Sequence, residues 1–257
     1  MTFDIKDYEL GKRPLWAIFA SLLIFAALVL FVINCVAFGE GSRLLPIYSV
    51  ETAEKKVAVT FNCAWSAEDI PQILEILEEY EAKATFFVLG QWAKDNPAAV
   101  KMIAEAGHEI GTHSNTHPDM AKLSESEILA ELYRSCEHIE KAGAEKPKLF
   151  RAPSGSYSET LIKTAGNAGF MTIQWDVDSR DWKDKTAAEM VESVTKNVRS
   201  GSIILFHSGK ENTLEALPQI FEILKNGGYE SVEVSKLIYH ENYTVDHTGR
   251  QHGLENG

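Results

Sequence analysis

The sequence has few cysteines and no excess of positive charge, and each shortage argues against a class of protein. Three cysteines, Cys35, Cys63 and Cys136, occur among 257 residues, and nothing in their placement indicates a disulfide framework. Acidic residues outnumber basic ones by 37 to 25, which gives a formal net charge of −12. A nucleic-acid partner is therefore not expected, because binding to phosphates depends on clustered positive charge. The sequence also contains no internal repeat.

Charged residues are missing from one long stretch near the N-terminus. Residues 15–38 are almost entirely apolar, and about 20 such residues suffice to cross a bilayer as a helix. A cleaved signal peptide is the alternative, but its apolar core usually spans about 7–15 residues. Lys12 and Arg13 precede the stretch, and basic residues stay on the cytoplasmic side. We therefore expect a retained single-pass transmembrane helix with the rest of the chain outside the membrane.

The remaining chain divides by composition into a folded domain and two polar flanks. We expect a cytoplasmic N-terminus at residues 1–14, the transmembrane helix at 15–38, a linker at 39–55, one folded domain at 56–239 and a flexible tail at 240–257. The tail is polar and poor in apolar residues, which is typical of segments that do not pack.

Apolar runs and amphipathic stretches alternate within the domain. The runs rich in β-branched and aromatic residues, predicted as strands, are Lys56–Phe61, Ala84–Leu89, Lys148–Phe150, Thr172–Trp175 and Ser202–Phe206. The stretches with helical periodicity are 71–82, 97–106, 125–142, 159–168, 187–199 and 214–226. Capping boxes at Ser124–Glu127 and Thr186–Glu189 indicate two helix starts. This alternation predicts an α/β fold with a parallel sheet, either an open doubly wound sheet or a barrel.

Polar motifs follow several of these strands, at the end where α/β folds place their sites. His113 and His117 are four residues apart and can meet one metal ion if the backbone curls by about one turn. Arg151 opens a sharp turn, an acidic loop spans 176–182, and His207 ends an apolar run. Each motif alone also fits an ordinary loop or rim, but together they indicate one assembled site.

These motifs resemble, in order and spacing, the polysaccharide deacetylase family of NodB-like carbohydrate esterases. The segments that carry the resemblance are Thr60–Cys63, His113–Pro118, Arg151–Gly155, Asp178–Trp182 and Leu205–His207, within roughly residues 55–238. The resemblance implies a distorted (β/α) barrel of the NodB type. It also implies removal of acetyl groups from chitin-like oligomers, peptidoglycan glycans or xylan with a divalent metal, usually Zn²⁺.

The resemblance assigns roles to individual residues. His113 and His117 match the metal-binding histidines, and the backbone N–H of Ser154 matches the oxyanion donor. His207 matches the general acid that protonates the leaving amine, and Asp178 matches the acidic residue near it. Two further residues are placed more loosely: Arg151 matches the arginine that holds the catalytic carboxylate network, and Trp182 either lines the sugar groove or packs.

The first motif departs from the family pattern. The family has two adjacent aspartates, a general base and a metal ligand, where this chain has Asn62 and Cys63. A carboxamide cannot accept a proton at neutral pH, so Asn62 cannot be a conventional base. Cys63 is either a thiolate ligand of zinc or a small buried apolar residue. Glu68 or Asp69 could supply the missing carboxylate, or they could be charges at a helix N-terminus.

Two functions follow as expectations. The first is a membrane-anchored, metal-dependent hydrolase of carbon–nitrogen bonds that deacetylates a cell-envelope or chitin-like polysaccharide. The alternative is a catalytically impaired relative that binds a glycan, or a partner protein, through the same cleft. The intact histidines and arginine favour the enzyme, and the Asn62–Cys63 replacement favours the binder.

Overall fold

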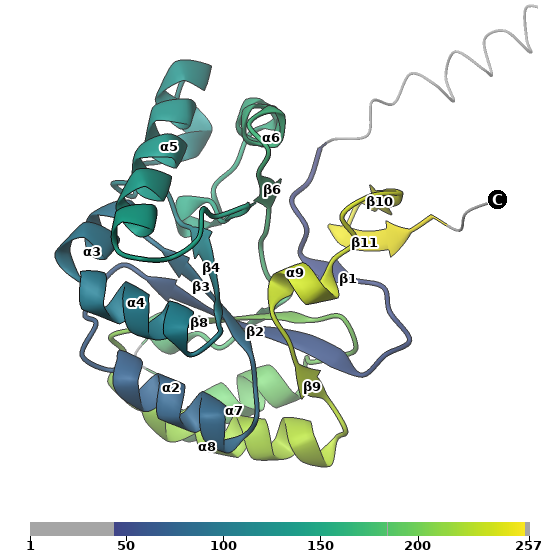
Figure 1. Cartoon of the computed structure of the whole chain (residues 1–257). Helices are drawn as coiled ribbons and strands as arrows, with labels where there is room; N and C mark the ends of the chain where they lie inside the picture. The colour runs from purple at the N-terminus through teal and green to yellow at the C-terminus, as the bar shows by residue number, and fades with distance from the viewer. Residues whose placement is uncertain (1–43, 184, 255–257) are drawn as a thin grey trace, which may run out of the picture. The chain divides into compact units, whose positions relative to one another are not determined.

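The structure is a computed structural model that describes residues 44–183 and 185–254 (Figure 1). The N-terminal segment 1–14, the predicted transmembrane helix 15–38 and the first part of the predicted linker lie outside the described residues. Within the described ranges no helix is long and apolar enough to cross a membrane.

Parallel strands form the centre of the fold. The strands are β1 (Ser49–Val50), β2 (Lys56–Cys63), β3 (Ala84–Val88), β4 (Glu109–Thr112), β5 (Leu149–Phe150), β6 (Met171–Thr172), β7 (Val177–Asp178), β8 (Ile203–His207), β9 (Glu230–Ser231), β10 (Tyr243–Val245) and β11 (Arg250–Gly253). The main sheet has the order β6-β5-β4-β3-β2-β8-β7, with β9 also paired to β2. Every pair in it is parallel, so the carboxyl ends of its strands meet on one side.

Helices connect the strands and cover the outer face of the sheet (Figure 1). They are α2 (Ile70–Glu79), α3 (Gly90–Asp95), α4 (Pro97–Glu105), α5 (Glu125–Lys141), α6 (Glu159–Asn167), α7 (Ala187–Thr195), α8 (Glu211–Asn226) and α9 (Val234–Leu237), with 3₁₀ turns η1 (Met120–Lys122), η2 (Pro153–Gly155) and η3 (Asp181–Lys183). The predicted capping boxes at the starts of α5 and α7 are confirmed.

The main sheet curves into a half-barrel that stays open at one seam. Its two edge strands, β6 and β7, do not pair with each other in the described part of the chain. The segment before β1 covers the β6 edge, because the Ile47 N–H donates to the Thr172 carbonyl at 2.9 Å and the Gln174 N–H donates to the Ile47 carbonyl at 2.7 Å. The predicted NodB-type α/β fold is thus present as an open half-barrel. Part of the predicted linker belongs to that fold.

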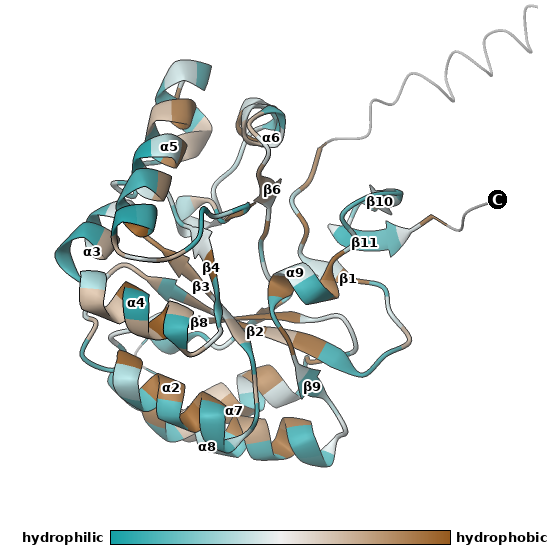
Figure 2. Cartoon of the chain, viewed as in Figure 1, coloured by the Kyte–Doolittle hydropathy of each residue, from teal (hydrophilic) through white to brown (hydrophobic). Residues whose placement is uncertain are grey.

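The two faces of β2 have different surroundings, and this decides what its last residues can do. Phe61 and Cys63 lie in the large apolar cluster that also contains Ile70 and Leu77 of α2. Alternate residues of a strand point to opposite faces, so Asn62 points away from that cluster. Figure 2 shows brown, hydrophobic stretches on β2, whereas β11 is teal and hydrophilic.

The C-terminal residues form a second, three-stranded sheet with the order β1-β11-β10. The prediction of a flexible tail is therefore wrong for residues 240–254. The His252 ring lies between two carboxylates, with Nδ1 2.6 Å from Glu51 and Nε2 2.9 Å from Asp246. Hydrogen bonds to Asp246 and Glu51 raise the pKa of His252. A polar composition misled the prediction because strand pairing with β1 holds these residues, and Val245 packs against the apolar cluster that contains Val50.

Candidate active-site cleft

A cleft of about 390 Å³ opens at the carboxyl ends of β2, β7 and β8 and beside the loop after β4. It is lined by Asn62, Ala64, Trp65, His113, His117, Ser154, Trp175, Asp178, Trp182, Leu205, His207 and Lys210. Six of the predicted site residues, Asn62, His113, His117, Ser154, Asp178 and His207, thus gather on one cleft, and Trp182 joins them. The structure leaves Cys63 out of this lining and buries Arg151 beneath it.

The two histidines after β4 face each other across a strained loop. Ser114 and His117 have positive φ values of 72° and 62°, which non-glycine residues rarely adopt. Glu131 of α5 holds this loop, because its carboxylate accepts from the backbone N–H groups of Asn115 and Thr116, both at 2.8 Å. The rings of His113 and His117 are 5.1 Å apart and nearly perpendicular, as two ligands of one ion could be.

The tautomer of His113 is set by Arg151. The Nδ1 of His113 lies 2.8 Å from the backbone carbonyl of Arg151, and a carbonyl only accepts, so Nδ1 carries the proton. Burial lowers the pKa of His113 to about 3, despite the hydrogen bond to the Arg151 carbonyl, which acts in the opposite direction. The ring is therefore neutral at physiological pH, and its Nε2 lone pair is left for a ligand.

Arg151 is fully buried and donates to neutral acceptors. Nη1 donates to the Thr60 hydroxyl at 2.8 Å and to Asn62 Oδ1 at 3.1 Å, and Nη2 donates to the Gln174 carbonyl at 3.0 Å. Its guanidinium carbon also lies 4.0 Å from the Phe87 ring centroid. Burial lowers the pKa of Arg151. No carboxylate accepts from Arg151 in the described residues, so the predicted carboxylate network is wrong and the arginine orients a carboxamide instead.

Cys63 does not join the histidines. Its side chain is fully buried in the helix-facing core, and burial raises the pKa of its thiol to about 12, which disfavours the thiolate. The predicted metal role of Cys63 is wrong for this reason, and the alternative of a small buried apolar residue holds. Ala64 is the next residue that lines the cleft, and it has no donor atom to offer a metal.

The missing carboxylate is not supplied from the start of α2 either. Glu68 is exposed and is absent from the cleft lining. Asp69 is buried, and its Oδ2 accepts from the Gly209 N–H at 2.6 Å, which ties the loop after β2 to the loop after β8. Burial raises the pKa of Asp69. Neither side chain lines the cleft, and Asp69 does not cap α2 with its side chain but joins the two loops.

The donors present do not fit the three-ligand metal site that the resemblance implied. Catalytic zinc sites usually have about three protein ligands, and His113 and His117 are two. Among the described residues no group of three or more histidine, cysteine, aspartate and glutamate side chains is placed to hold one ion.

His207 has a buried carboxylate partner, and that partner is Asp181. The Oδ1 of Asp181 lies 2.7 Å from His207 Nδ1, and its Oδ2 accepts from the backbone N–H of His207 at 2.6 Å. Asp178, predicted as the acidic neighbour, instead accepts from the Arg180 N–H at 2.8 Å and from Trp182 Nε1 at 3.4 Å. The sequence indicated only an acidic loop at this position. Arg180 adopts a positive φ of 61°, and the sequence has no glycine there that would have indicated a turn.

Two aromatic side chains flank the cleft, and sequence reasoning missed one of them. Trp65 is 50 % exposed and Trp182 is 47 % exposed. The Trp65 ring centroid lies 5.2 Å from that of His207, and Lys210 Nζ lies 4.6 Å from the centroid of the same tryptophan ring. Trp65 follows the altered motif directly, so its position after a strand end was the available signal. Ser154, which the resemblance assigned as oxyanion donor, adopts a positive φ of 55° in η2.

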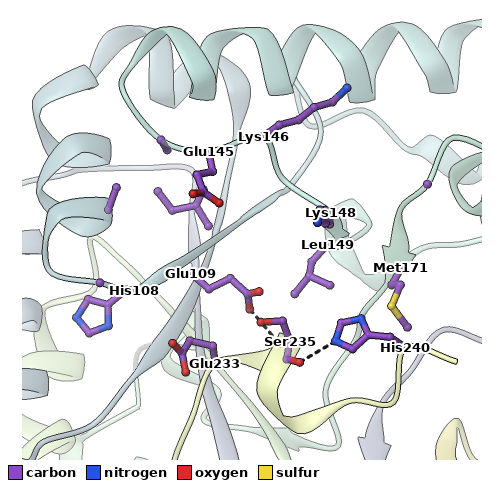
Figure 3. Close-up of a pocket in the computed structure, with 15 residues that line it drawn as sticks. His108, Glu109, Glu145, Lys146, Lys148, Leu149, Met171, Glu233, Ser235 and His240 are labelled. Atoms are coloured by element: carbon purple, nitrogen blue, oxygen red, sulfur yellow. Dashed lines mark hydrogen bonds between the residues drawn. The ribbon is translucent and has the colours of Figure 1, made fainter.

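A second cavity of about 580 Å³ lies at the amino ends of β4, β5 and β6 (Figure 3). Two of its polar side chains, Glu109 and His240, bind the backbone of Ser235. Glu109 accepts from the Ser235 N–H at 3.1 Å, and His240 Nε2 donates to the Ser235 carbonyl at 2.8 Å. Burial lowers the pKa of His108 at its edge to about 4, in keeping with a structural role. Because parallel α/β sheets bind ligands at the carboxyl ends of their strands, the cleft is the candidate site.

Known proteins resemble this chain over the same residues. The family described as polysaccharide deacetylase matches residues 49–173. The uncharacterized protein YlxY of Bacillus subtilis is 36 % identical over 199 residues, which are 77 % of this chain and 62 % of YlxY. A peptidoglycan-N-acetylglucosamine deacetylase of Bacillus cereus is 36 % identical over 196 residues, which are 74 % of this chain and 92 % of the relative.

Solved structures with the same fold include both active and inactive relatives. A wild-type pseudoenzyme of the CE4 family from Bacillus anthracis superposes with a TM-score of 0.73 at 36 % identity, covering 81 % of this chain and 73 % of that one. A mutant of that pseudoenzyme with restored enzymatic activity gives 0.72 at 39 % identity, covering 75 % and 71 %. The order of the motifs, the half-barrel and these relatives agree, and the chain belongs to the polysaccharide deacetylase (NodB) family of carbohydrate esterases.

Proposed function

We propose that this chain is a catalytically impaired member of the family that binds an acetylated cell-envelope glycan through the cleft. One observation carries the proposal. Asn62 stands where the resemblance places the general base, and its oxygen is occupied by a hydrogen bond from Arg151 at 3.1 Å. A carboxamide held in this way cannot take a proton from water.

The metal site that the reaction would need is also incomplete at the end of β2. The strand that would supply a third ligand supplies Cys63, which is buried away from the cleft, and Ala64, which has no donor. The residues that would position a ligand are nevertheless kept, because Arg151 still orients the side chain of Asn62 and the ring of His113. This combination of retained orientation and lost reactivity supports binding over turnover.

The walls of the cleft suit a saccharide. Trp65 and Trp182 expose about half of their surface beside it, and an exposed aromatic face combines an apolar surface with a polar edge. Lys210, Asp178 and the Ser154 backbone add polar groups around this apolar surface. Pockets for small ligands usually combine an apolar lining with a few placed polar groups. Relatives named as deacetylases of peptidoglycan and of chitooligosaccharides supply the glycan class.

A slow deacetylase is the second candidate, and the pair of His207 and Asp181 favours it. A buried carboxylate 2.7 Å from Nδ1 is the arrangement expected of an imidazole that delivers a proton to a leaving amine. His113 and His117 also remain on the cleft as two donors for an ion.

The location of the domain follows from the apolar run at residues 15–38 and the basic residues before it. We propose a single-pass anchor with residues from about 44 onward outside the cytoplasm, where they reach cell-envelope glycan. A reporter fused after residue 254 and active only in an oxidising, external location would support this topology. Activity of a reporter that works only in the cytoplasm would contradict it.

Parallel assays of binding and turnover separate the two candidates. The full chain in detergent would be incubated with N-acetylated chitopentaose and with peptidoglycan, in EDTA and in Zn²⁺, while acetate release and glycan binding are measured. We expect binding in both media and no acetate. Acetate release that depends on Zn²⁺ would contradict the proposal and support the slow enzyme.

A further inference from the structure

The orientation of the Asn62 carboxamide is fixed by its neighbour. A guanidinium group donates and never accepts, so the atom that faces Arg151 Nη1 at 3.1 Å has to be the oxygen. The Nδ2 amino group therefore occupies the other position. No described residue accepts a hydrogen bond from it, although Asn62 lines the cleft. The side chain thus presents two N–H donors where an aspartate would present an acceptor.

His113 offers the opposite polarity on the same cleft. Its Nδ1 donates to the Arg151 carbonyl at 2.8 Å, so the lone pair of the neutral ring lies on Nε2. No described residue donates a hydrogen bond to Nε2, and His113 lines the cleft together with Asn62. Arg151 therefore orients both groups, the donor through its side chain and the acceptor through its backbone carbonyl.

A secondary amide is the ligand group that matches such a pair, because its carbonyl accepts and its N–H donates. We propose that the cleft recognises an intact N-acetyl group, with the carbonyl oxygen held by Asn62 Nδ2 and the N–H held by His113 Nε2. This inference rests on the proposed glycan-binding function. It makes Asn62 a specificity-determining residue. The position that the resemblance assigns to the general base would here distinguish acetylated from deacetylated sugars.

Other sugar substituents fit this pair less well. A hydroxyl group carries its donor and its acceptor on one oxygen, whereas a secondary amide carries them on two atoms and so reaches partners that lie further apart. A protonated amine cannot accept from Asn62, and it would also meet Lys210 on the lining. Asp178 is the one carboxylate among the lining residues that could attract an amine, and its oxygens already accept from the Arg180 N–H and from Trp182 Nε1.

Three pentasaccharides that differ only at C2 test the inference on the full chain in detergent with EDTA. They are N-acetylated chitopentaose, its fully deacetylated form and cellopentaose, and binding would be measured by calorimetry. We expect the acetylated ligand to bind about tenfold more tightly than either of the others, since both lack the acetyl carbonyl that accepts from Asn62. This comparison needs no variant, so a folding defect cannot obscure it.

Asn62→Asp then assigns the preference to one residue. The aspartate keeps the size of the side chain and can pair with Arg151, but it presents an acceptor to the acetyl carbonyl. We expect the preference to fall by about tenfold, with the thermal midpoint of unfolding as the check on folding. Asn226→Asp makes the same charge change at the exposed end of α8 and should leave the preference intact.

The outcomes separate this inference from the proposed function. Equal affinity for all three pentasaccharides would contradict recognition of the N-acetyl group but not the proposed glycan binding. No binding of any of them would overturn both. A preference that survives in Asn62→Asp would show that Asn62 is not the residue responsible.

Discussion

The two halves of the cleft differ in what they retain. At the end of β8, His207 keeps a buried carboxylate partner, Asp181, at 2.7 Å. At the end of β2, the corresponding acidic positions hold Asn62 and Cys63, and only the first of these faces the cleft. The contacts that orient side chains survive in both halves, whereas the groups that would accept a proton or complete a metal site are missing from the β2 half.

The β2 half thus keeps the contacts that orient its side chains without the carboxylates that the resemblance implied. A buried arginine with no carboxylate partner is costly, because its charge is removed from water without an opposite charge. Arg151 is kept in this fold by three neutral acceptors and by the face of Phe87, at 4.0 Å from the ring centroid. This arrangement fits the proposed role of Arg151, which is to orient Asn62 and His113 toward a ligand.

Placing two carboxylates in the β2 half should cause the largest change in activity, because it supplies the groups that this half of the cleft lacks. Asn62→Asp would supply a base beside Arg151, and Ala64→Asp would place a carboxylate on the lining that Ala64 shares with the two histidines. We expect the double variant to release acetate from N-acetylated chitopentaose in Zn²⁺, about 10²–10⁴-fold faster than Ala64→Asp alone, the range that a positioned base contributes.

The matched control is Asn62→Asp combined with Cys63→Asp, which follows the sequence motif instead of the structure. Its second carboxylate enters the apolar core, so we expect a destabilised protein without acetate release. A folded Asn62→Asp/Ala64→Asp variant that binds Zn²⁺ and releases no acetate would show that these carboxylates are not what separates the two halves.

The second-largest change is expected in the affinity for Zn²⁺. With His113 and His117 as its two ligands, the wild type should bind Zn²⁺ weakly, and Ala64→Asp alone should raise the affinity by at least about tenfold. His113→Ala added to Ala64→Asp should remove that gain. Calorimetric titration of the full chain in detergent at fixed pH would measure both changes. Equal affinities of the wild type and Ala64→Asp would contradict the placement of residue 64.

Much of the fold could be predicted because the signals are local. The apolar periods predicted β2, β3, β5 and β8 and the helices α2 and α4 to α8, but not β4, β7, β9 or α3. Ser124 and Thr186 cap their helices as their sequence neighbours indicated. The position of the cleft also followed, because the motifs lie at strand ends and the carboxyl ends of parallel strands meet on one side. The choice of a distorted barrel came from the family resemblance and not from periodicity, and the structure shows an open half-barrel.

The directions of side chains could not be predicted in the same way. Cys63 was assigned to the cleft by its place in a motif, although the two-residue period of β2 sends it to the opposite face from Asn62. Asp181 was overlooked because the turn at Arg180, with φ of 61°, brings it beneath His207. The sheet formed by residues 243–253 depends on partners near residue 50, and no local pattern encodes that contact.

Removing the partner of His207 should affect stability more than removing the carboxylate beside it. Asp181 is buried and accepts from the His207 N–H, from the ring and from the Thr213 hydroxyl. Asp181→Ala leaves these donors without an acceptor and should cost about 3 kcal/mol in the free energy of unfolding. Asp178→Ala, on the cleft surface, should cost less than about 1 kcal/mol. Urea denaturation would measure both, and equal losses would contradict the assignment of Asp181.

The smallest expected effect is the pH dependence of the free energy of unfolding that His113, on the β2 side of the cleft, contributes. Its pKa is lowered to about 3 in the folded protein, against about 6.5 for an unperturbed histidine. The folded state therefore holds the ring neutral, while the unfolded chain takes up a proton below about pH 6.5. The stability from this residue is complete above that pH and is lost as the pH falls towards 3.

Between pH 7 and pH 5 this linkage should lower the free energy of unfolding by about 1–2 kcal/mol. Urea denaturation in EDTA at both pH values would measure the loss, and His113→Gln, which cannot be protonated, should reduce it. His108→Gln is the companion variant, since the pKa of His108 is lowered as well, to about 4, outside the cleft. A pH dependence that is unchanged in His113→Gln would show that the ring is not held neutral, and that its Nε2 is not the acceptor that the β2 side of the cleft offers.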